Sequence, residues 1–343
     1  MESIRIGIVG LGGICRDRHV PGFQKIDGVE IVSVVNRSGE SSRAAADAFG
    51  IPVVDDSWEA MVARDDLDAI VIGTWPYKHR DISIAALASG KHVFCQARMA
   101  MNRAEAEEMI GVSRAKDKVA MLCPVPFGLS IDKTMVKILA NGTLGEVRLV
   151  RVQSFTDLFA ADDALVNWRK DHRLSGLNMH TLGMYIEVMH RWFGMTESVA
   201  ATSDIFVEER PEADGESLSI RIPDQILANA HMENGVPVQY TMNAAVPNGA
   251  DRIEIYGSER TLVYEVFTNE FSWVNMDGTL SPVAIAEGDG YDIRNWRVEE
   301  DFIRAIREPD FDYYPSFEDG LQYMKVVQAI YDSIEGGKAV TIG

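Results

Sequence analysis

Short apolar runs alternate with helix-like segments over the first third of the chain. The runs are IRIGIVG from Ile4, EIVSVVN from Glu30, AIVIG from Ala69 and HVFC from His92. Continuous apolar character indicates strands that are covered on both faces, and their alternation with helices predicts βαβ units. We therefore expect an α/β domain with a doubly wound parallel sheet over residues 1–122.

After Asn141-Gly142 the strands become longer, and their apolar and polar residues alternate. They are expected at EVRLVRVQSF, ESVAATSDIFV, SLSIRI, DQILANAHME, PVQYTMNAAV, RIEIYGS and RTLVYEVF. Alternation places one face of a sheet against a core, and turn signals such as Asn234-Gly235 favour antiparallel connections. The pattern predicts an α+β domain over residues 123–343 with a large, mostly antiparallel sheet.

Two helices are predicted to close the chain, around Val298–Arg307 and Phe317–Ile334, and Gly336-Gly337 ends the second. The domain boundary is expected near residues 120–125, which Pro124 and Pro126 mark. These helices therefore fall in the second domain.

Composition narrows the possible partners. The 343 residues, 46% of them hydrophobic, suffice for two domains, and the net charge of -19 disfavours binding to nucleic acid or to an anionic membrane surface. Cys15, Cys95 and Cys123 form neither a metal-ligand spacing nor a disulfide framework, and the seven histidines are scattered, so no metal site is expected. No signal peptide or run of 18 apolar residues is apparent, and a soluble cytoplasmic protein is expected.

A glycine-rich turn, Gly10-Leu11-Gly12-Gly13-Ile14, joins the first strand to the first helix. Gly10 makes the tight turn, Gly12 lets the backbone approach a pyrophosphate, and the helix N-terminus offers free N–H groups. Cys15 replaces the third glycine of the dinucleotide-binding fingerprint. In the alternative interpretation this segment is only a tight loop without a ligand, but its position between a strand and a helix favours cofactor binding.

The second strand ends in Asn36, Arg37 and Ser38, where an NAD-specific site usually has a carboxylate for the ribose 2′-hydroxyl. Arg37 suits a 2′-phosphate, and Ser38 adds a hydroxyl donor. NADP(H) is therefore favoured over NAD(H). In the alternative interpretation, Arg37 stacks on the adenine of NAD or points to solvent.

The run GKHVFCQARMA, from Gly90 to Ala100, carries a family resemblance. It resembles the signature Gly-Lys-His-Val-x-Cys-Glu-Lys-Pro of the Gfo/Idh/MocA oxidoreductases, with Gln96, Ala97 and Arg98 in place of the last three residues. Further stretches resemble this family at Gly73–His79, Asn141–Val147, Trp168-Arg169 with Ser175-Gly176, and Ile255–Gly257 with the final helix. The resemblance covers essentially the whole chain.

The resemblance implies a Rossmann domain joined to an open-faced sheet, which commonly mediates assembly into a homo-oligomer, here a dimer or tetramer. It implies that Thr74, Trp75 and His79 line the nicotinamide end of the cofactor; His79 is alternatively a structural histidine. Gln96, which can only hydrogen-bond, is assigned to the cofactor site. Arg169 is expected to contact the cofactor or the substrate.

In typical family members the lysine of this signature and an Asp-x-x-x-His pair handle the substrate proton. Ala97 cannot exchange a proton, and Arg98 stays protonated, so Arg98 can stabilise a developing alkoxide but cannot act as a base. Lys170 and His172 are reserve candidates for the proton, although a solvated charge run is the plain alternative for them.

A helix is expected over SGLNMHTLGMYIE, from Ser175 onward. Aligned from its Trp-Phe-Gly ending, it places His180 and Met184 in the slots of the pair, with Glu187 on the same face. His180 is the favoured proton acceptor, since imidazole titrates near neutral pH, but a buried core histidine is the alternative. An offset of one residue selects Thr181 and Tyr185 instead.

Three functions fit these observations. The leading hypothesis is an NADP(H)-preferring oxidoreductase that acts on a sugar, a cyclitol or a related polyhydroxy compound. The second is a cleaving enzyme that oxidises its substrate transiently, and the third is a nucleotide-binding protein without catalysis. The substrate itself cannot be predicted, because loops of the second domain determine specificity.

Overall fold

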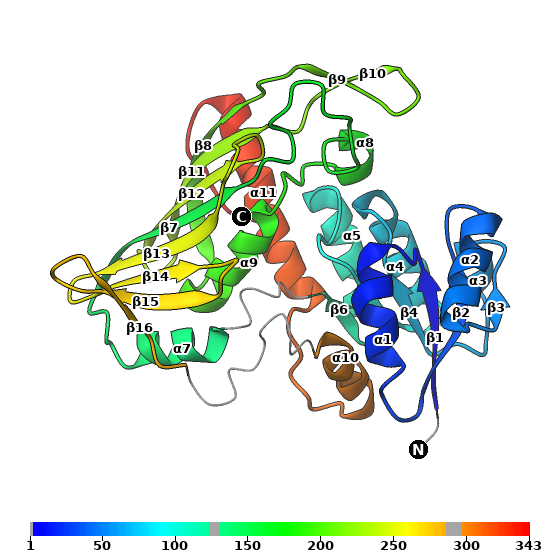
Figure 1. Cartoon of the computed structure of the whole chain (residues 1–343). Coiled ribbons are helices and arrows are strands. Elements are labelled where there is room, and N and C mark those ends of the chain that lie inside the picture. The colour runs from blue at the N-terminus through cyan, green and yellow to red at the C-terminus, as the bar shows by residue number, and fades with distance from the viewer. Residues whose placement is uncertain (1–2, 124–130, 286–296) are drawn as a thin grey trace. The chain divides into compact units, whose positions relative to one another are not determined.

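The computed structural model describes residues 3–123, 131–285 and 297–343, and the chain forms two compact units (Figure 1). The first unit comprises Met1–Pro124 and Trp296–Leu321, and the second comprises Val125–Asn295 and Gln322–Gly343. The sequence pattern assigned 296–321 to the second domain. This segment groups with the first unit because the ring of Phe302 packs 5.5 Å from that of Phe94, between centroids. Pro124 and Pro126 lie outside the described residues.

The first unit contains a six-stranded parallel sheet in the order β3-β2-β1-β4-β5-β6. Its strands are β1 (Ile4–Val9), β2 (Val29–Val35), β3 (Val53–Val54), β4 (Ala69–Ile72), β5 (His92–Cys95) and β6 (Ala120–Leu122). β4 is buried throughout, as its unbroken apolar run predicts for a strand covered on both faces. The predicted doubly wound parallel sheet is confirmed.

The first unit also contains helices, and all but the last of them lie between successive strands of this sheet. They are η1 (Cys15–His19), α1 (Val20–Phe23), α2 (Gly39–Phe49), α3 (Trp58–Val62), η2 (Pro76–Lys78), α4 (His79–Ala88), α5 (Arg103–Arg114) and α10 (Val298–Arg307). Side chains cap three of them: Ser38 before α2, Ser57 before α3 and Asn102 before α5 each accept a backbone N–H from the first turn. The predicted strand-helix alternation thus has clear local start signals.

The second unit contains a nine-stranded sheet in the order β16-β15-β14-β13-β7-β12-β11-β8-β17. Its strands are β7 (Val147–Phe155), β8 (Thr196–Asp204), β11 (Gln225–Met232), β12 (Pro237–Asn243), β13 (Asp251–Gly257), β14 (Thr261–Glu265), β15 (Glu270–Val274), β16 (Leu280–Pro282) and β17 (Val340–Thr341). Only the β7 and β12 pair is parallel, which confirms the mostly antiparallel sheet.

One expected strand of this sheet lies elsewhere. From SLSIRI only β10 (Ser217–Ser219) is a strand, and it pairs with β9 (Glu209–Pro211) in a separate two-stranded ribbon. β10 pairs with the strand that precedes it along the chain, so it joins no strand of the large sheet.

The helices of the second unit are α7 (Asp132–Ala140), α8 (His172–Ser175), α9 (Leu182–Phe193) and most of α11 (Phe317–Gly336). α9 and α11 pack closely, since a Cβ added to Gly183 would lie 3.2 Å from the ring of Tyr323. Figure 1 shows both helices beside the large sheet. In the described part of the chain, no helix is long and apolar enough to cross a membrane.

Candidate functional site

The glycine turn after β1 is fixed by the loop that follows β4. Gly10 has φ 85°, and a Cβ there would lie 2.7 Å from the backbone nitrogen of Thr74, so packing requires glycine. A Cβ on Gly12 would meet no protein atom within 4 Å, which leaves this backbone open to a ligand. Gly13 and the exposed Ile14 lead into η1.

Two residues after β2 bear on the site: Asn36, which hydrogen-bonds to the glycine turn, and the positively charged Arg37. Asn36 Oδ1 accepts the backbone N–H of Leu11 at 2.7 Å, and the Ser38 hydroxyl accepts the N–H of Ser41 in a capping box. Arg37 is exposed and has no hydrogen bond or ion pair with any described residue. Arg37 is therefore the side chain of this trio that remains for a ligand.

His79 joins two loops of the first unit. Its Nδ1 lies 2.8 Å from the carbonyl oxygen of Arg98, and its Nε2 lies 2.9 Å from that of Thr74. The ring is fully buried, and burial lowers its pKa. His79 thus acts on its neighbours through the backbone, whereas the adjacent Trp75 is only half-buried. The Thr74 hydroxyl is buried and finds no hydrogen-bond partner in the described residues.

Gln96 is hydrogen-bonded to the buried pair of His19 and Glu299. Its amide nitrogen can only donate, so it donates to His19 Nε2, and His19 Nδ1 donates in turn to Glu299. Glu299 comes from α10, which explains why this contact leaves no signal near Gln96 in the sequence. Arg98 is 5% exposed, and the Ala97–Arg98 peptide bond is cis.

The cysteines of this unit are poorly suited to act as thiolate nucleophiles. All three are buried and free, and burial raises the pKa of Cys15 to about 12 and that of Cys95 and Cys123 as well. Within residues 3–123, 131–285 and 297–343, no cluster of His, Cys, Asp and Glu fits a metal ion.

Taken together, the first-unit residues converge on the carboxyl ends of β1, β2, β4 and β5. In open parallel sheets this is the edge where ligands bind. Two observations fit a dinucleotide there: the open backbone at Gly12, and the buried hydroxyl of Thr74, which has no hydrogen-bond partner in the described part of the chain.

The helix expected from Ser175 begins later than predicted. α9 starts at Leu182 with Thr181 as its N-cap, so His180 lies before the helix and shares no helical face with Met184 and Glu187. His180 is half-buried and has φ 43°, a left-handed conformation that is rare for residues other than glycine. The prediction that His180 shares a helical face with Met184 and Glu187 is therefore wrong. Gly176 and the turn that follows it interrupt the helix that was expected from Ser175.

The two reserve residues differ in their surroundings. Lys170 is 1% exposed, and its Nζ lies 2.6 Å from Asp224 and donates to the Ile222 carbonyl at 2.9 Å. This amine is committed to a structural ion pair. His172 is half-buried at the start of α8, and Arg169 stacks 4.4 Å from the ring centroid of Trp168.

Four polar residues form a network that the sequence did not reveal as a unit. Thr181 Oγ1 lies 2.7 Å from Ser154 Oγ, and the Tyr185 hydroxyl donates to Asp251 Oδ2 at 2.5 Å. Ser154 and Asp251 are direct partners across β7 and β13. Thr181 and Tyr185 are the pair that the alternative alignment selected, and the signal for Asp251 was only a carboxylate at the start of an apolar strand.

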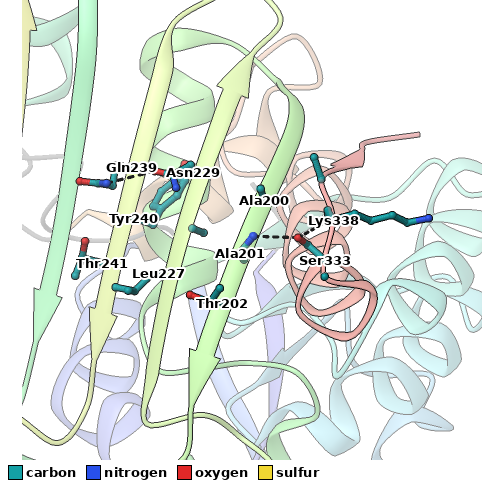
Figure 2. A pocket seen from close by; sticks show the side chains of 13 residues that line it. Ala200, Ala201, Thr202, Leu227, Asn229, Gln239, Tyr240, Thr241, Ser333 and Lys338 are labelled. Carbon is teal, nitrogen blue, oxygen red and sulfur yellow. Dashed lines mark hydrogen bonds between the residues drawn. The ribbon is translucent and has the colours of Figure 1, made fainter.

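A hollow of 510 Å³ lies in the second unit over β8, β11 and β12 (Figure 2). At its edge Ser333 Oγ accepts from the Ala201 N–H at 3.0 Å and donates to the Lys338 carbonyl at 2.7 Å. The residues that line this hollow include no carboxylate, histidine or cysteine, and its titratable side chains are Tyr240 and Lys338.

Two family models match the chain. One describes an oxidoreductase family with an NAD-binding Rossmann fold and matches residues 4–123; the other describes the C-terminal alpha/beta domain of this family and matches residues 136–342. The chain belongs to the Gfo/Idh/MocA oxidoreductase family. The predicted family is confirmed, and this member is an NAD(P)-binding oxidoreductase.

Several similar proteins have names that state an activity. The chain is 22% identical to levoglucosan dehydrogenase of Pseudarthrobacter phenanthrenivorans over 97% of its own length and 96% of that protein. It is 26% identical to inositol 2-dehydrogenase of Gluconacetobacter diazotrophicus over 58% and 57%. A levoglucosan dehydrogenase structure with NADH and levoglucosan shares the fold, with a TM-score of 0.88, 20% identity and full coverage of both chains.

Proposed function

We propose that this family member is an NADP(H)-preferring oxidoreductase that acts on a secondary hydroxyl of a sugar, a cyclitol or a related polyhydroxy compound. The observation that carries the proposal is the glycine turn: Asn36 pins it, Gly10 packs on Thr74, and Gly12 stays open. The substrate class rests on the similar proteins, which are named for levoglucosan and inositol.

The preference for NADP(H) rests on the end of β2. No carboxylate stands at positions 36–38 to accept a ribose 2′-hydroxyl, and Arg37 is exposed and has no hydrogen bond or ion pair with the residues that the structure describes. A guanidinium binds phosphate oxygens with charge-assisted hydrogen bonds. Ser38 already caps α2, so Arg37 carries the discrimination.

The bound nicotinamide supplies the acceptor or donor of a hydride. The chain supplies position and charge. The N–H groups after Gly12 would hold the pyrophosphate, His79 holds the loops of Thr74 and Arg98, and Arg98 would provide positive charge for a developing alkoxide.

The proton of the substrate hydroxyl needs an acceptor on the chain. The residues directly before α9 offer two groups, the imidazole of His180 and the hydroxyl of Thr181. Both belong to the proposed substrate site, together with His172 and Arg169.

A spectrophotometric panel tests the function. Purified protein is mixed with NADP or NAD and with polyols, cyclitols and anhydrosugars, and the reduced-nicotinamide absorbance is followed. Turnover that favours NADP supports the proposal. Substrate cleavage without net cofactor reduction identifies the transient-oxidation alternative, and tight cofactor binding without turnover identifies a non-catalytic protein. Unaltered turnover in His180→Ala removes that imidazole from the mechanism.

The quaternary structure belongs to the same proposal. We expect a homo-oligomer, a dimer or tetramer, that forms through the outer face of the nine-stranded sheet, where Leu227 is 40% exposed in the middle of β11. Sedimentation of wild type and Leu227→Glu tests this. Dissociation of the variant supports the interface, and an unchanged oligomer or a monomeric wild type refutes it.

A further inference from the structure

The network of Thr181, Ser154, Asp251 and Tyr185 has an outer and an inner end. Thr181 is half-buried, whereas Ser154 is 4%, Asp251 4% and Tyr185 0% exposed. All four belong to the second unit. The chain of hydroxyls therefore leads from a partly exposed position inward to a buried carboxyl group.

The Thr181 hydroxyl is not used in the usual way. Threonine at an N-cap normally accepts a backbone N–H of its own helix, but Thr181 makes no such bond. Its Oγ1 lies 2.7 Å from Ser154 Oγ instead. Helix α9 therefore has no side-chain cap from Thr181, whose hydroxyl instead belongs to the hydrogen-bond network.

Asp251 has donors around it but no cation. It accepts from the Phe155 N–H at 3.2 Å and from Tyr185 at 2.5 Å, and a hydrogen bond from Ser154 also reaches it. No salt bridge from a described lysine, arginine or histidine includes Asp251. Burial raises the pKa of Asp251, and the bonds from Tyr185 and Ser154 oppose that rise.

We infer that these residues form a proton relay for the proposed oxidation, with Thr181 as the catalytic residue and Asp251 as the proton sink. The inference rests on the proposed function. As the hydride leaves the substrate carbon for the nicotinamide, the substrate O–H bond breaks and its proton goes to Thr181 Oγ1. The Thr181 proton moves to Ser154, and the Ser154 proton moves to the Asp251 carboxylate, which becomes neutral. Reduction runs the same steps in reverse.

Tyr185 acts differently from the other members. It donates to Asp251 and also has a hydrogen bond with Ser154, but the direct bond between Ser154 and Asp251 does not pass through it. It is a positioning residue that stabilises the carboxylate. Removing its hydroxyl leaves the relay intact and moves the pKa of Asp251 upward, because a bond that lowers this pKa is lost.

The relay is tested by pH profiles of kcat for oxidation. Asp251 must be ionised to accept a proton, so wild-type kcat rises with pH through its pKa. Thr181→Val and Asp251→Asn lower kcat by about 10²–10⁴-fold. Thr181→Ser restores it, and Thr268→Val, at an exposed position of the turn between β14 and β15, is the matched control for loss of a threonine hydroxyl.

Tyr185→Phe provides the readout that a purely structural role would not move. Its rising limb shifts to higher pH, because a bond that lowers the pKa of Asp251 is lost, while the plateau remains. The infrared carboxyl band of Asp251, identified by its absence in Asp251→Asn, titrates with the same shift and does not depend on turnover. If Asp251→Asn does not fold, the position of the kcat limb in Tyr185→Phe is the readout.

The outcomes separate the two proposals. A wild-type protein that oxidises no panel substrate refutes the proposed function and the relay with it. Turnover in wild type with equal turnover in Thr181→Val overturns the relay alone. The relay is also overturned if the rising limb of the kcat profile does not move in Tyr185→Phe. The same holds if this limb disappears in His180→Ala but remains in Thr181→Val.

Discussion

Replacing Arg37 with alanine should weaken NADPH binding and leave NADH binding nearly unchanged. Arg37 is the second residue after β2, is exposed, and has no hydrogen bond or ion pair with described residues. Its loss therefore breaks no contact inside the described protein. Any effect on affinity reports on a contact with the ligand.

The magnitude follows from the nature of that contact. Hydrogen bonds to charged groups contribute about 1.5–3 kcal/mol, and solvent exposure moves the value toward the lower end. We expect the dissociation constant of NADPH to rise about 10-fold in Arg37→Ala, and that of NADH to change less than about twofold. The dependence of NADPH affinity on salt should become weaker in the same variant.

Asn36→Ala is the matched control. Asn36 Oδ1 holds the Leu11 N–H at 2.7 Å, so its loss loosens the glycine turn that serves both cofactors. Fluorescence titration with NADH and NADPH should show equal weakening for both in Asn36→Ala, and weakening for NADPH alone in Arg37→Ala. Equal losses in Arg37→Ala, or no loss for NADPH, would refute a 2′-phosphate role for Arg37.

Three other variants test parts of the same account. Gly10→Ala, which combines a positive φ with a Cβ contact of 2.7 Å to Thr74, should destabilise the fold by about 1–3 kcal/mol and abolish binding of both cofactors; normal titration curves would contradict this. His79→Ala removes the hydrogen bond that the neutral ring donates to one of the two nearby carbonyl groups and should cost about 1–3 kcal/mol in urea unfolding, with loss of cofactor affinity. Burial lowers the pKa of His190 from 6.5 to about 4. Between these pH values only the unfolded chain binds a proton at this imidazole, so the free energy of unfolding should fall by up to about 3 kcal/mol as the pH drops through this range. His190→Gln should flatten that dependence, whereas His231→Gln, at an exposed position, should not.

The sequence predicted the folded units well because their signals are local. Continuous apolar runs separated by helices report a covered parallel sheet, and the alternation around Gln225–Met232 reports a half-exposed one. The capping residue Ser38 and the glycine at position 10 likewise act on near neighbours along the chain.

The candidate site was only partly predictable because much of it depends on distant contacts. Glu299 reaches Gln96 through His19, and Asp251 meets Tyr185 across 66 residues of sequence. Helical periodicity also misplaced His180, since the helix starts only at Leu182. No pattern of local spacing encodes which of two adjacent residues enters a hydrogen-bond network.

The oxidation of polyhydroxy compounds by the wild-type protein is the most direct test of the central claim. The measurement is the initial rate of reduced-nicotinamide formation, with NADP and with NAD, across sugars, cyclitols and anhydrosugars. We expect substrate-dependent reduction for at least one of these compounds, with a higher kcat/KM for NADP. Absence of reduction by every compound with either cofactor, in protein that binds NADPH, would contradict it.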